Sequence, residues 1–432
     1  LAFILLLGAC RMDGFAQGTK YEAENGTLTG SVSVQTTVAG FSGTGYAGIF
    51  ENDGDKAAVT FNLSAAGNYD LYIGYAGPYG DKKNILTINS NSIEASFPAS
   101  PAFTETACGR VRLKEGSNTI SITKSWGWFL LDYFRIEPDT KPDVSVLLPY
   151  KLSTRAPHRE TRMLWSYLMD SFTHRIHSGA MSLNAKEEAE WLFAQTGRYP
   201  ALTGLDFMNH TRNYSWYDKS VVVNEARNWY NRNGLVAICW HWRDPSRATE
   251  EFYTSGTSFD ISKITETTSA EYQAMLSDID IIAGYLKQLN ADKIPVLFRP
   301  LHEASGRWFW WGAKGPEPCK ALWRLMFDRL VNYHGLKNLI WVWTTDAAPD
   351  NLEWYPGDEY VDILGADIYA ADGDFSSQLL TYDAIKEKFG GRKLVTLSEN
   401  GPVPDPERLM ADGAHWSWFM PWNGSYVMDS VA

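Results

Sequence analysis

The sequence has few cysteines, no excess of basic residues and no long apolar run, and each absence excludes a class of protein. Only 4 of the 432 residues are cysteines. No CxxC or His/Cys spacing indicates zinc, so we expect Cys108, Cys239 and Cys319 to be small buried thiols, with one disulfide among them left open. Lys and Arg number 39 against 51 Asp and Glu, for a net charge of −12. That balance argues against nucleic acid or an anionic membrane surface as a partner.

The apolar stretch at Leu1–Ala9 is too short to span a bilayer. We interpret it as part of a signal peptide covering residues 1–17, and we expect the protein to be exported. Two processing routes stay open. Leu7-Gly8-Ala9-Cys10 resembles a bacterial lipobox, which would leave Cys10 anchored to lipid. Cleavage near Phe15-Ala16-Gln17 would instead release a freely secreted protein.

Aromatic residues, in contrast, are abundant: 18 Trp, 22 Tyr and 20 Phe make up 14% of the chain. A large core accounts for part of this excess. The tryptophans, however, gather at expected strand ends and loops, where core packing gives little reason for them. Because sugar rings stack on indoles through their flat C–H faces, the pattern favours a carbohydrate ligand.

The chain divides into regions of different periodicity. Residues 18–137 consist of short alternating runs separated by Gly, Asn and Ser turns, which predicts an all-β jelly-roll or β-sandwich module. Residues 138–157 are rich in Pro, Asp, Lys and Ser, which indicates a linker. Residues 158–432 alternate between helical stretches and short apolar runs, which predicts the α/β class and a (β/α)8 TIM barrel. The alternative, a doubly wound sheet, lacks the glycine-rich phosphate loop expected after its first strand.

The barrel prediction depends on the apolar runs and the helices between them. The expected strands are Arg175–His177, Leu202–Asp206, Leu235–Trp240, Ile294–Arg299, Leu339–Thr344, Ile363–Ile368, Leu394–Leu397 and Ser417–Trp422. The expected helices include Asn184–Gln195, Ser220–Asn231, Ser269–Leu289 and Glu317–Tyr333.

Two glutamates lie at the ends of the fourth and seventh expected strands. Glu303 follows His302 and precedes a run of aromatics, whereas Glu399 stands in Ser-Glu-Asn-Gly-Pro. Active sites of such barrels lie at the carboxyl ends of the strands, and these two strands face each other across the mouth. Glycoside hydrolysis needs such a pair, an acid and a nucleophile or base. A single rim glutamate is more often a structural ion-pair partner, but the two together favour catalysis.

The run Arg-Pro-x-His-Glu-x-x-Gly-x-Trp-Phe-Trp-Trp-Gly at Arg299–Gly312 resembles glycoside hydrolase family 26, which consists mostly of endo-β-1,4-mannanases. The segment Ser398–Gly401 is similar to the nucleophile strand of that family, and the resemblance covers the chain from about Pro157 onward. It implies a retaining endo-β-1,4-mannanase with Glu303 as acid/base and Glu399 as nucleophile. Their carboxyl groups would lie roughly 5–5.5 Å apart, and catalysis would need no cofactor.

The same resemblance implies substrate contacts around the glutamates. His302 would orient the site and bind the sugar at the cleavage subsite, and Trp308 would stack on a sugar in the cleft. The segment Cys239–Trp242 is similar to the third-strand Trp-His of the family, which places His241 at a glycone subsite.

Further roles follow on the sixth and eighth strands. Tyr369 would donate a hydrogen bond to the nucleophile. Trp422, preferred to Trp416 and Trp418 because it lies nearer the carboxyl end, would form the floor of the cleavage subsite. Arg299 is expected to pair with a catalytic carboxylate, with a purely structural ion pair as the alternative.

The β module resembles family 35 carbohydrate-binding modules through Tyr21–Glu24 and Trp128–Ile136. That family's structural Ca2+ site implies Glu22, Glu24 and Asp132 as oxygen ligands. Three unrelated surface carboxylates are the alternative.

Within the module, Trp126 is the expected sugar-stacking residue, and Trp128 is expected to pack inward. The expected partner is a mannan-type polysaccharide or oligosaccharide, and we expect a monomer with no protein partner. The catalytic motifs do not exclude a β-1,3-xylanase or a mixed-linkage β-glucanase of the same family. A non-catalytic polysaccharide-binding protein on the same barrel also stays open.

Overall fold

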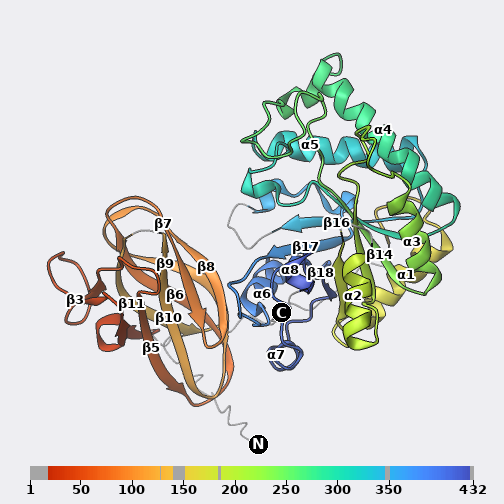
Figure 1. The fold of residues 1–432 in the computed structure, drawn as a ribbon. Coiled ribbons are helices and arrows are strands. Elements are labelled where there is room, and N and C mark those ends of the chain that lie inside the picture. Colours follow the sequence, from red (N-terminus) through yellow and green to blue (C-terminus); the bar gives the residue numbers. More distant parts are fainter. Residues whose placement is uncertain (1–17, 127, 140–150, 183–185, 346–350, 429–432) are drawn as a thin grey trace, which may run out of the picture. The chain divides into compact units, whose positions relative to one another are not determined.

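The chain folds into two compact units that divide near residue 143 (Figure 1). The computed structural model describes residues 18–126, 128–139, 151–182, 186–345 and 351–428. The expected signal peptide, with Cys10, and most of the expected linker lie outside the described residues. Across the described ranges, no helix combines the length and apolar character needed to cross a membrane.

The first unit consists of two antiparallel sheets, drawn from red to orange in Figure 1. One sheet has the order β3 (Ser33–Gln35), β4 (Tyr46–Gly48), β11 (Leu130–Pro138), β6 (Gly67–Gly77) and β9 (Ser100–Leu113), with β1 (Thr19–Glu22) paired to β11. The other has the order β2 (Thr27–Thr29), β5 (Lys56–Leu63), β10 (Gly116–Trp126), β7 (Lys82–Ile88) and β8 (Asn91–Phe97). A short 3-10 helix, Ala23–Asn25, follows β1.

The two sheets of this unit pack face to face through alternate apolar side chains, as the period of two predicts. Leu71 and Ile73 of β6 and Ile122 of β10 are fully buried. Tyr75 of β6 meets Phe97 of β8 across the interface, with ring centroids 5.1 Å apart. The expected β-sandwich is therefore confirmed.

The second unit is a barrel of parallel strands. Its order is β18 (Leu394–Asn400), β17 (Ile363–Ile368), β16 (Leu339–Thr345), β15 (Val296–Pro300), β14 (Leu235–Trp240), β13 (Leu202–Asp206), β12 (His177–Met181) and β19 (Trp418–Phe419). The first and last members meet because Asn400 bridges Pro421, and the Ser417 amide donates to the Val395 carbonyl at 2.8 Å. The nearly closed (β/α)8 architecture confirms the predicted fold class.

Helices cover the outside of this barrel (Figure 1). They are α1 (Arg159–Ser171), α2 (Glu187–Thr196), α3 (Val221–Asn231), α4 (Ala270–Ala291), α5 (Pro316–Phe327), α6 (Leu379–Lys388), α7 (Pro406–Asp412) and α8 (Ser425–Met428). The strands they cover are buried on both faces; every residue of β15, β16 and β18 is buried.

Three expected elements differ from the observed ones. The strand expected at Arg175–His177 begins at His177 instead, because Ser-Gly-Ala has weak β propensity and hides the strand. The strand expected at Ser417–Trp422 is limited to β19, since Pro421 has no amide for the ladder. The helix expected at Glu317–Tyr333 ends at Phe327 and continues as a π-helical segment, Asp328–Tyr333.

Among the described residues, Cys108, Cys239 and Cys319 are free thiols, so no disulfide joins them. Cys239 and Cys319 are buried as expected, and Cys108 is partly buried.

Candidate active site

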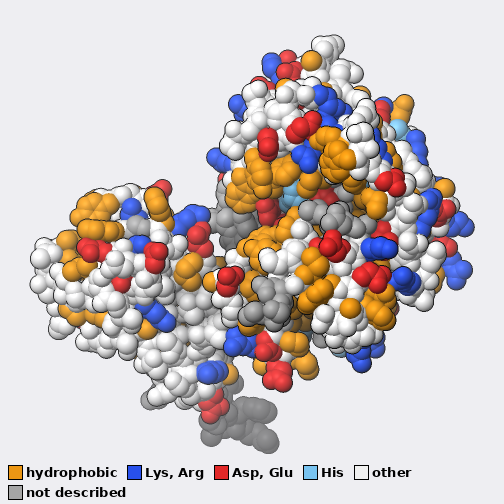
Figure 2. Space-filling model, viewed as in Figure 1, with side chains coloured by type: hydrophobic (Ala, Val, Ile, Leu, Met, Phe, Trp, Pro, Cys, Tyr) orange, Lys and Arg blue, Asp and Glu red, His pale blue; other side chains and the backbone are white. Residues whose placement is uncertain are grey.

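The carboxyl ends of five barrel strands bring the candidate residues together. Asp206 ends β13, His241 follows β14, Glu303 follows β15, Tyr369 follows β17, and Glu399 lies in the last two residues of β18. Figure 2 shows hydrophobic side chains gathered around a hollow on this unit, with histidine and acidic side chains visible within it. The arrangement agrees with the general position of active sites in this fold.

Glu399 is buried and receives two strong hydrogen bonds. Its Oε2 accepts from Nη2 of Arg299 at 2.5 Å, and its Oε1 accepts from the Tyr369 hydroxyl at 2.5 Å. Both donors hold the carboxylate and fix its direction. The burial of Tyr369 and the negative charge of Glu399 raise the pKa of the Tyr369 hydroxyl, so it remains a donor.

Arg299 bridges two carboxylates below the mouth of the barrel. Its Nη1 donates to Oδ2 of Asp367 at 2.6 Å, and the Ser398 hydroxyl donates to Oδ1 of the same Asp367 at 2.6 Å. Burial alone would lower the pKa of Arg299, but the charges of Asp367 and Glu399 raise it well above its usual range. Arg299 therefore stays charged, and its ion pairs join it to both Asp367 and Glu399.

Glu303 has a different environment from Glu399. Burial and the negative charge of Glu399 raise its pKa, although Arg299 and a hydrogen bond from Trp308 act in the opposite direction. That bond joins Nε1 of Trp308 to Oε2 of Glu303 at 2.9 Å. One carboxylate is thus held by two donors while the other tends to keep its proton, which is the division of roles that an acid and a nucleophile need.

The backbone around Glu303 is unusual. Leu301, Glu303 and Arg307 have φ values of 50°, 52° and 61°, in the left-handed region that non-glycine residues rarely adopt. Such conformations cluster at functional sites because the surrounding structure must hold them in place. Here they turn the chain sharply after β15 and aim Glu303 and Trp308 toward each other.

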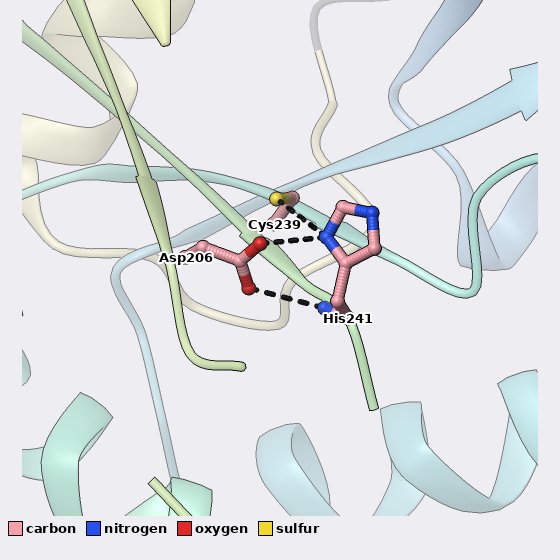
Figure 3. Close-up of side chains that lie close together, drawn as sticks. All are labelled: Asp206, Cys239 and His241. Carbon is pink, nitrogen blue, oxygen red and sulfur yellow. Dashed lines mark hydrogen bonds and ion pairs between the residues drawn. The ribbon is translucent and has the colours of Figure 1, made fainter. Parts of the chain in front are cut away.

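A hydrogen-bonded chain of Asp206, His241 and His302 lies beside the glutamates. Asp206 accepts from the backbone amide of His241 at 3.1 Å and contacts its Nδ1 at 2.6 Å (Figure 3). Nε2 of His241 lies 3.1 Å from Nε2 of His302. Burial and the charges of His241 and Arg299 lower the pKa of His302 well below its usual range, which favours the neutral ring. The sequence did not single out Asp206, although its place at a strand end was a usable signal.

Asp206, Cys239 and His241 are also the described residues closest to a metal-binding arrangement, since one ligand atom from each lies within 4.8 Å of the others. The chemistry does not fit a metal. Burial raises the pKa of the Cys239 thiol well above its usual range, whereas metal binding requires the thiolate. In addition, the 2.6 Å contact with Asp206 already occupies Nδ1 of His241.

The tryptophans considered for sugar contacts differ in their exposure to solvent. Trp308 is 48% exposed and Trp422 is half-buried, with its ring 5.4 Å from that of His241. Trp416 and Trp418 are buried, which leaves Trp422 as the tryptophan of the three that can reach a ligand.

An aromatic wall that the sequence did not predict lies next to Trp308 and His241. Tyr253 stacks on Phe309 with centroids 5.3 Å apart, and Phe309 stacks on Trp311 at 4.4 Å. Phe252 approaches His241 at 5.3 Å. These residues come from the loops after β14 and β15. Nothing in the sequence of the two loops indicates that their aromatic rings contact each other.

In the first unit, Trp126 lies at the end of β10 and is 69% exposed. The expectation for Trp128 is wrong, because it is 51% exposed and its ring meets that of Tyr79 edge to face at 6.4 Å. The reason is the strand boundary. Since β11 begins at Leu130, Trp128 belongs to the loop, and Phe129 packs inward instead.

Glu22, Glu24 and Asp132 gather around one loop. The Ser42 amide donates to both carboxylate oxygens of Asp132 at 3.0 Å, and its hydroxyl donates to Glu22 at 2.7 Å. The Thr44 amide donates to Oε1 of Glu24 at 2.8 Å. Burial and the charges of Glu22 and Glu24 raise the pKa of Asp132 to about 6, despite the opposing Ser42 bonds.

Comparisons with known proteins agree with this two-unit organisation. The model of glycosyl hydrolase family 26 matches residues 153–431, and that of carbohydrate binding module family 35 matches residues 19–139. A mannan endo-1,4-beta-mannosidase of Thermothelomyces thermophilus is 39% identical over 421 residues, which cover 95% of this chain and 85% of that protein.

Two further relatives match almost the whole of this chain. Mannan endo-1,4-beta-mannosidase B of Piromyces sp is 36% identical, over 96% of this chain and 73% of that protein. The crystal structure of the Podospora anserina GH26-CBM35 beta-(1,4)-mannanase aligns with a TM-score of 0.63 at 37% identity, over 96% of this chain and 93% of that chain. The chain belongs to glycosyl hydrolase family 26 and carries a family 35 carbohydrate-binding module in front of its barrel.

Proposed function

We propose that the protein is a retaining endo-β-1,4-mannanase that cleaves mannan-type polysaccharide. The observation that carries this proposal is the unequal pair of glutamates. Arg299 and Tyr369 both donate to Glu399, whereas burial and a neighbouring negative charge raise the pKa of Glu303. The names of the full-length relatives supply the substrate class.

The reaction proceeds in two displacements. In the first, a carboxylate oxygen of Glu399 bonds to the anomeric carbon, the glycosidic C–O bond breaks, and Glu303 gives its proton to the leaving oxygen. In the second, Glu303 takes a proton from water as the water oxygen attacks the same carbon, and the ester to Glu399 breaks. The Arg299 and Tyr369 contacts hold Glu399 for the attack and receive it again as a free carboxylate.

The proposal is tested with Glu399→Ala on soluble mannan and mannan oligosaccharides. Turnover should be lost while binding to the polymer stays measurable, and the β anomer should appear first in proton NMR of wild-type hydrolysis. Glu317→Ala, at a site whose side chain is 82% exposed on α5, is the matched control and should keep full activity. Absence of reducing ends from mannan with wild type refutes the proposal. Release from β-1,3-xylan or mixed-linkage glucan instead would identify the substrate as one of those polymers, and binding without any hydrolysis would identify a binding protein.

We propose that the first unit binds polysaccharide through the exposed rings of Tyr79, Trp126 and Trp128. Tethering to the barrel would raise the local concentration of substrate, an effective-concentration gain. Trp126→Ala and Trp128→Ala should each reduce retention on insoluble mannan without changing turnover of short oligosaccharides.

We further propose a structural Ca2+ at Glu22, Glu24 and Asp132, with no cofactor for catalysis. Oε2 of Glu24 is buried without a hydrogen-bond partner among the described residues, and three carboxylates share one loop. Oxygen-rich sets of this kind suit a hard cation. Ca2+ should raise the unfolding temperature of the unit, a chelator should reverse the effect, and Asp132→Asn should weaken it; an unfolding temperature indifferent to Ca2+ contradicts the site.

Export, either as a freely secreted protein or as one anchored at Cys10, is proposed from the apolar start of the sequence. Mass spectrometry of the natural amino terminus distinguishes the two forms. A monomer is the proposed state, which light scattering coupled to gel filtration tests.

A further inference from the structure

We propose that Tyr214 and Trp216 form a distal subsite that binds a neutral sugar unit of the polysaccharide, beyond the units bound next to His241. The inference rests on the proposed mannanase function and extends it to longer chains. Both residues lie in the loop between β13 and α3, at the same end of the barrel as Glu303 and Glu399.

Trp216 presents a large exposed indole surface, although the Tyr217 ring also meets it edge to face with centroids 5.8 Å apart. Trp216 is 70% exposed, and it stacks on Tyr214 with ring centroids 5.0 Å apart and an interplanar angle of 20°. Packing within the loop explains the ring face of Trp216 that contacts Tyr214. It does not explain the large part of the indole that remains exposed to solvent. A flat exposed indole of this kind is the surface that the C–H face of a pyranose covers, and its apolar character selects a neutral sugar over a charged one.

Hydrogen bonds anchor the Tyr214 side chain of this platform. The Tyr214 hydroxyl donates to Glu250, whose carboxylate also accepts from Nε of Arg212 at 3.0 Å. Arg212 is itself buried and donates to the backbone carbonyls of Asp244 and Thr249 at 2.8 and 2.9 Å. Because these bonds fix the Tyr214 ring before any ligand arrives, little conformational entropy remains to be lost on binding.

The platform is continuous with the candidate active site. The Arg243 guanidinium lies over the Tyr214 ring at 6.0 Å and over the Phe252 ring at 5.8 Å. Phe252 in turn lies 5.3 Å from His241 and 4.7 Å from Tyr253. A row of ring contacts therefore leads from the histidine beside the catalytic glutamates outward to Trp216, along one side of the mouth. A linear polysaccharide bound at His241 has an aromatic path to follow in this direction.

The test compares long and short substrates for Trp216→Ala. We expect KM on mannan polymer and long oligosaccharides to rise about three- to tenfold, the size of one lost aromatic stacking contact, with kcat unchanged. The kcat/KM of the shortest oligosaccharide that wild type cleaves should stay unchanged, because that substrate does not reach the platform. Trp216→Phe keeps a flat ring and should recover most of the affinity.

Tyr333→Ala is the matched control, because Tyr333 is an aromatic residue of similar exposure, 68%, on the π-helical segment after α5. It should leave both substrates unaffected. Equal losses on short and long substrates, or no loss on long ones, overturn the subsite while leaving the proposed function intact. Failure of wild type to cleave mannan refutes the proposed function itself, which is a separate result seen before any variant is compared.

Discussion

Replacing Trp308 by Phe is expected to move the alkaline limb of the pH–activity profile to higher pH. The indole Nε1 donates to Oε2 of Glu303 at 2.9 Å, and this bond is one of the contacts that lower the pKa of that carboxyl group. The first displacement needs Glu303 protonated, so the alkaline limb of kcat/KM follows its loss of a proton. Without the bond the charged form loses stability, the pKa rises further, and the protonated acid persists to higher pH.

The size of this effect follows from the contact. A hydrogen bond to a charged group contributes about 1.5–3 kcal/mol, but Trp308 is 48% exposed and water replaces part of the bond. A net loss of about 1 kcal/mol corresponds to a shift of roughly half to one pH unit.

The assay is kcat/KM on a mannan oligosaccharide across a pH series. Both limbs of the profile are fitted together. Tyr253→Phe removes a hydroxyl from the same aromatic wall and should leave the alkaline limb in place. An alkaline limb that stays fixed in Trp308→Phe, or that moves to lower pH, would refute the reasoning.

Two other changes test the buried network. Arg299→Leu leaves Asp367 and Glu399 buried without their shared cation, which should destabilise the barrel by about 3–5 kcal/mol in denaturant unfolding; an unchanged midpoint would contradict the bridging role. Asp206→Asn removes the negative charge that holds His241 but keeps a side chain of nearly the same size. It should lower kcat/KM about tenfold with little change in unfolding temperature. Wild-type activity in that variant would show that the histidines keep their positions without it.

Much of the fold and the two glutamates could be predicted from sequence, because both depend on local patterns. The alternation of helices with apolar runs predicts the barrel. The rule that active sites lie at the carboxyl ends of the strands predicts Glu303 and Glu399 as candidate catalytic residues. Arg299 lies on β15 and Tyr369 follows β17, at the same end of the barrel, and the structure brings both to Glu399.

The remaining contacts depend on register and loop shape, which no local pattern encodes. Asp206 meets His241 because β13 and β14 pair with Asp206 opposite Cys239, a match fixed only when the strands assemble. The platform of Tyr214 depends on Glu250, 36 residues later in a different loop. Trp128 is exposed, against the expectation that it packs inward, because it precedes the first residue of β11, Leu130, and the position of a strand start is not encoded locally.

The left-handed backbone conformation of Glu303, the proposed catalytic acid, lowers the stability of the fold. Only glycine adopts this conformation freely, and a non-glycine residue there costs on the order of 1 kcal/mol or more. Selection for stability alone would therefore favour replacing the acid by glycine, and its presence at φ 52° records a requirement that outweighs that gain. Increasing the stability of this barrel without loss of activity is thus a matter for positions elsewhere in the chain.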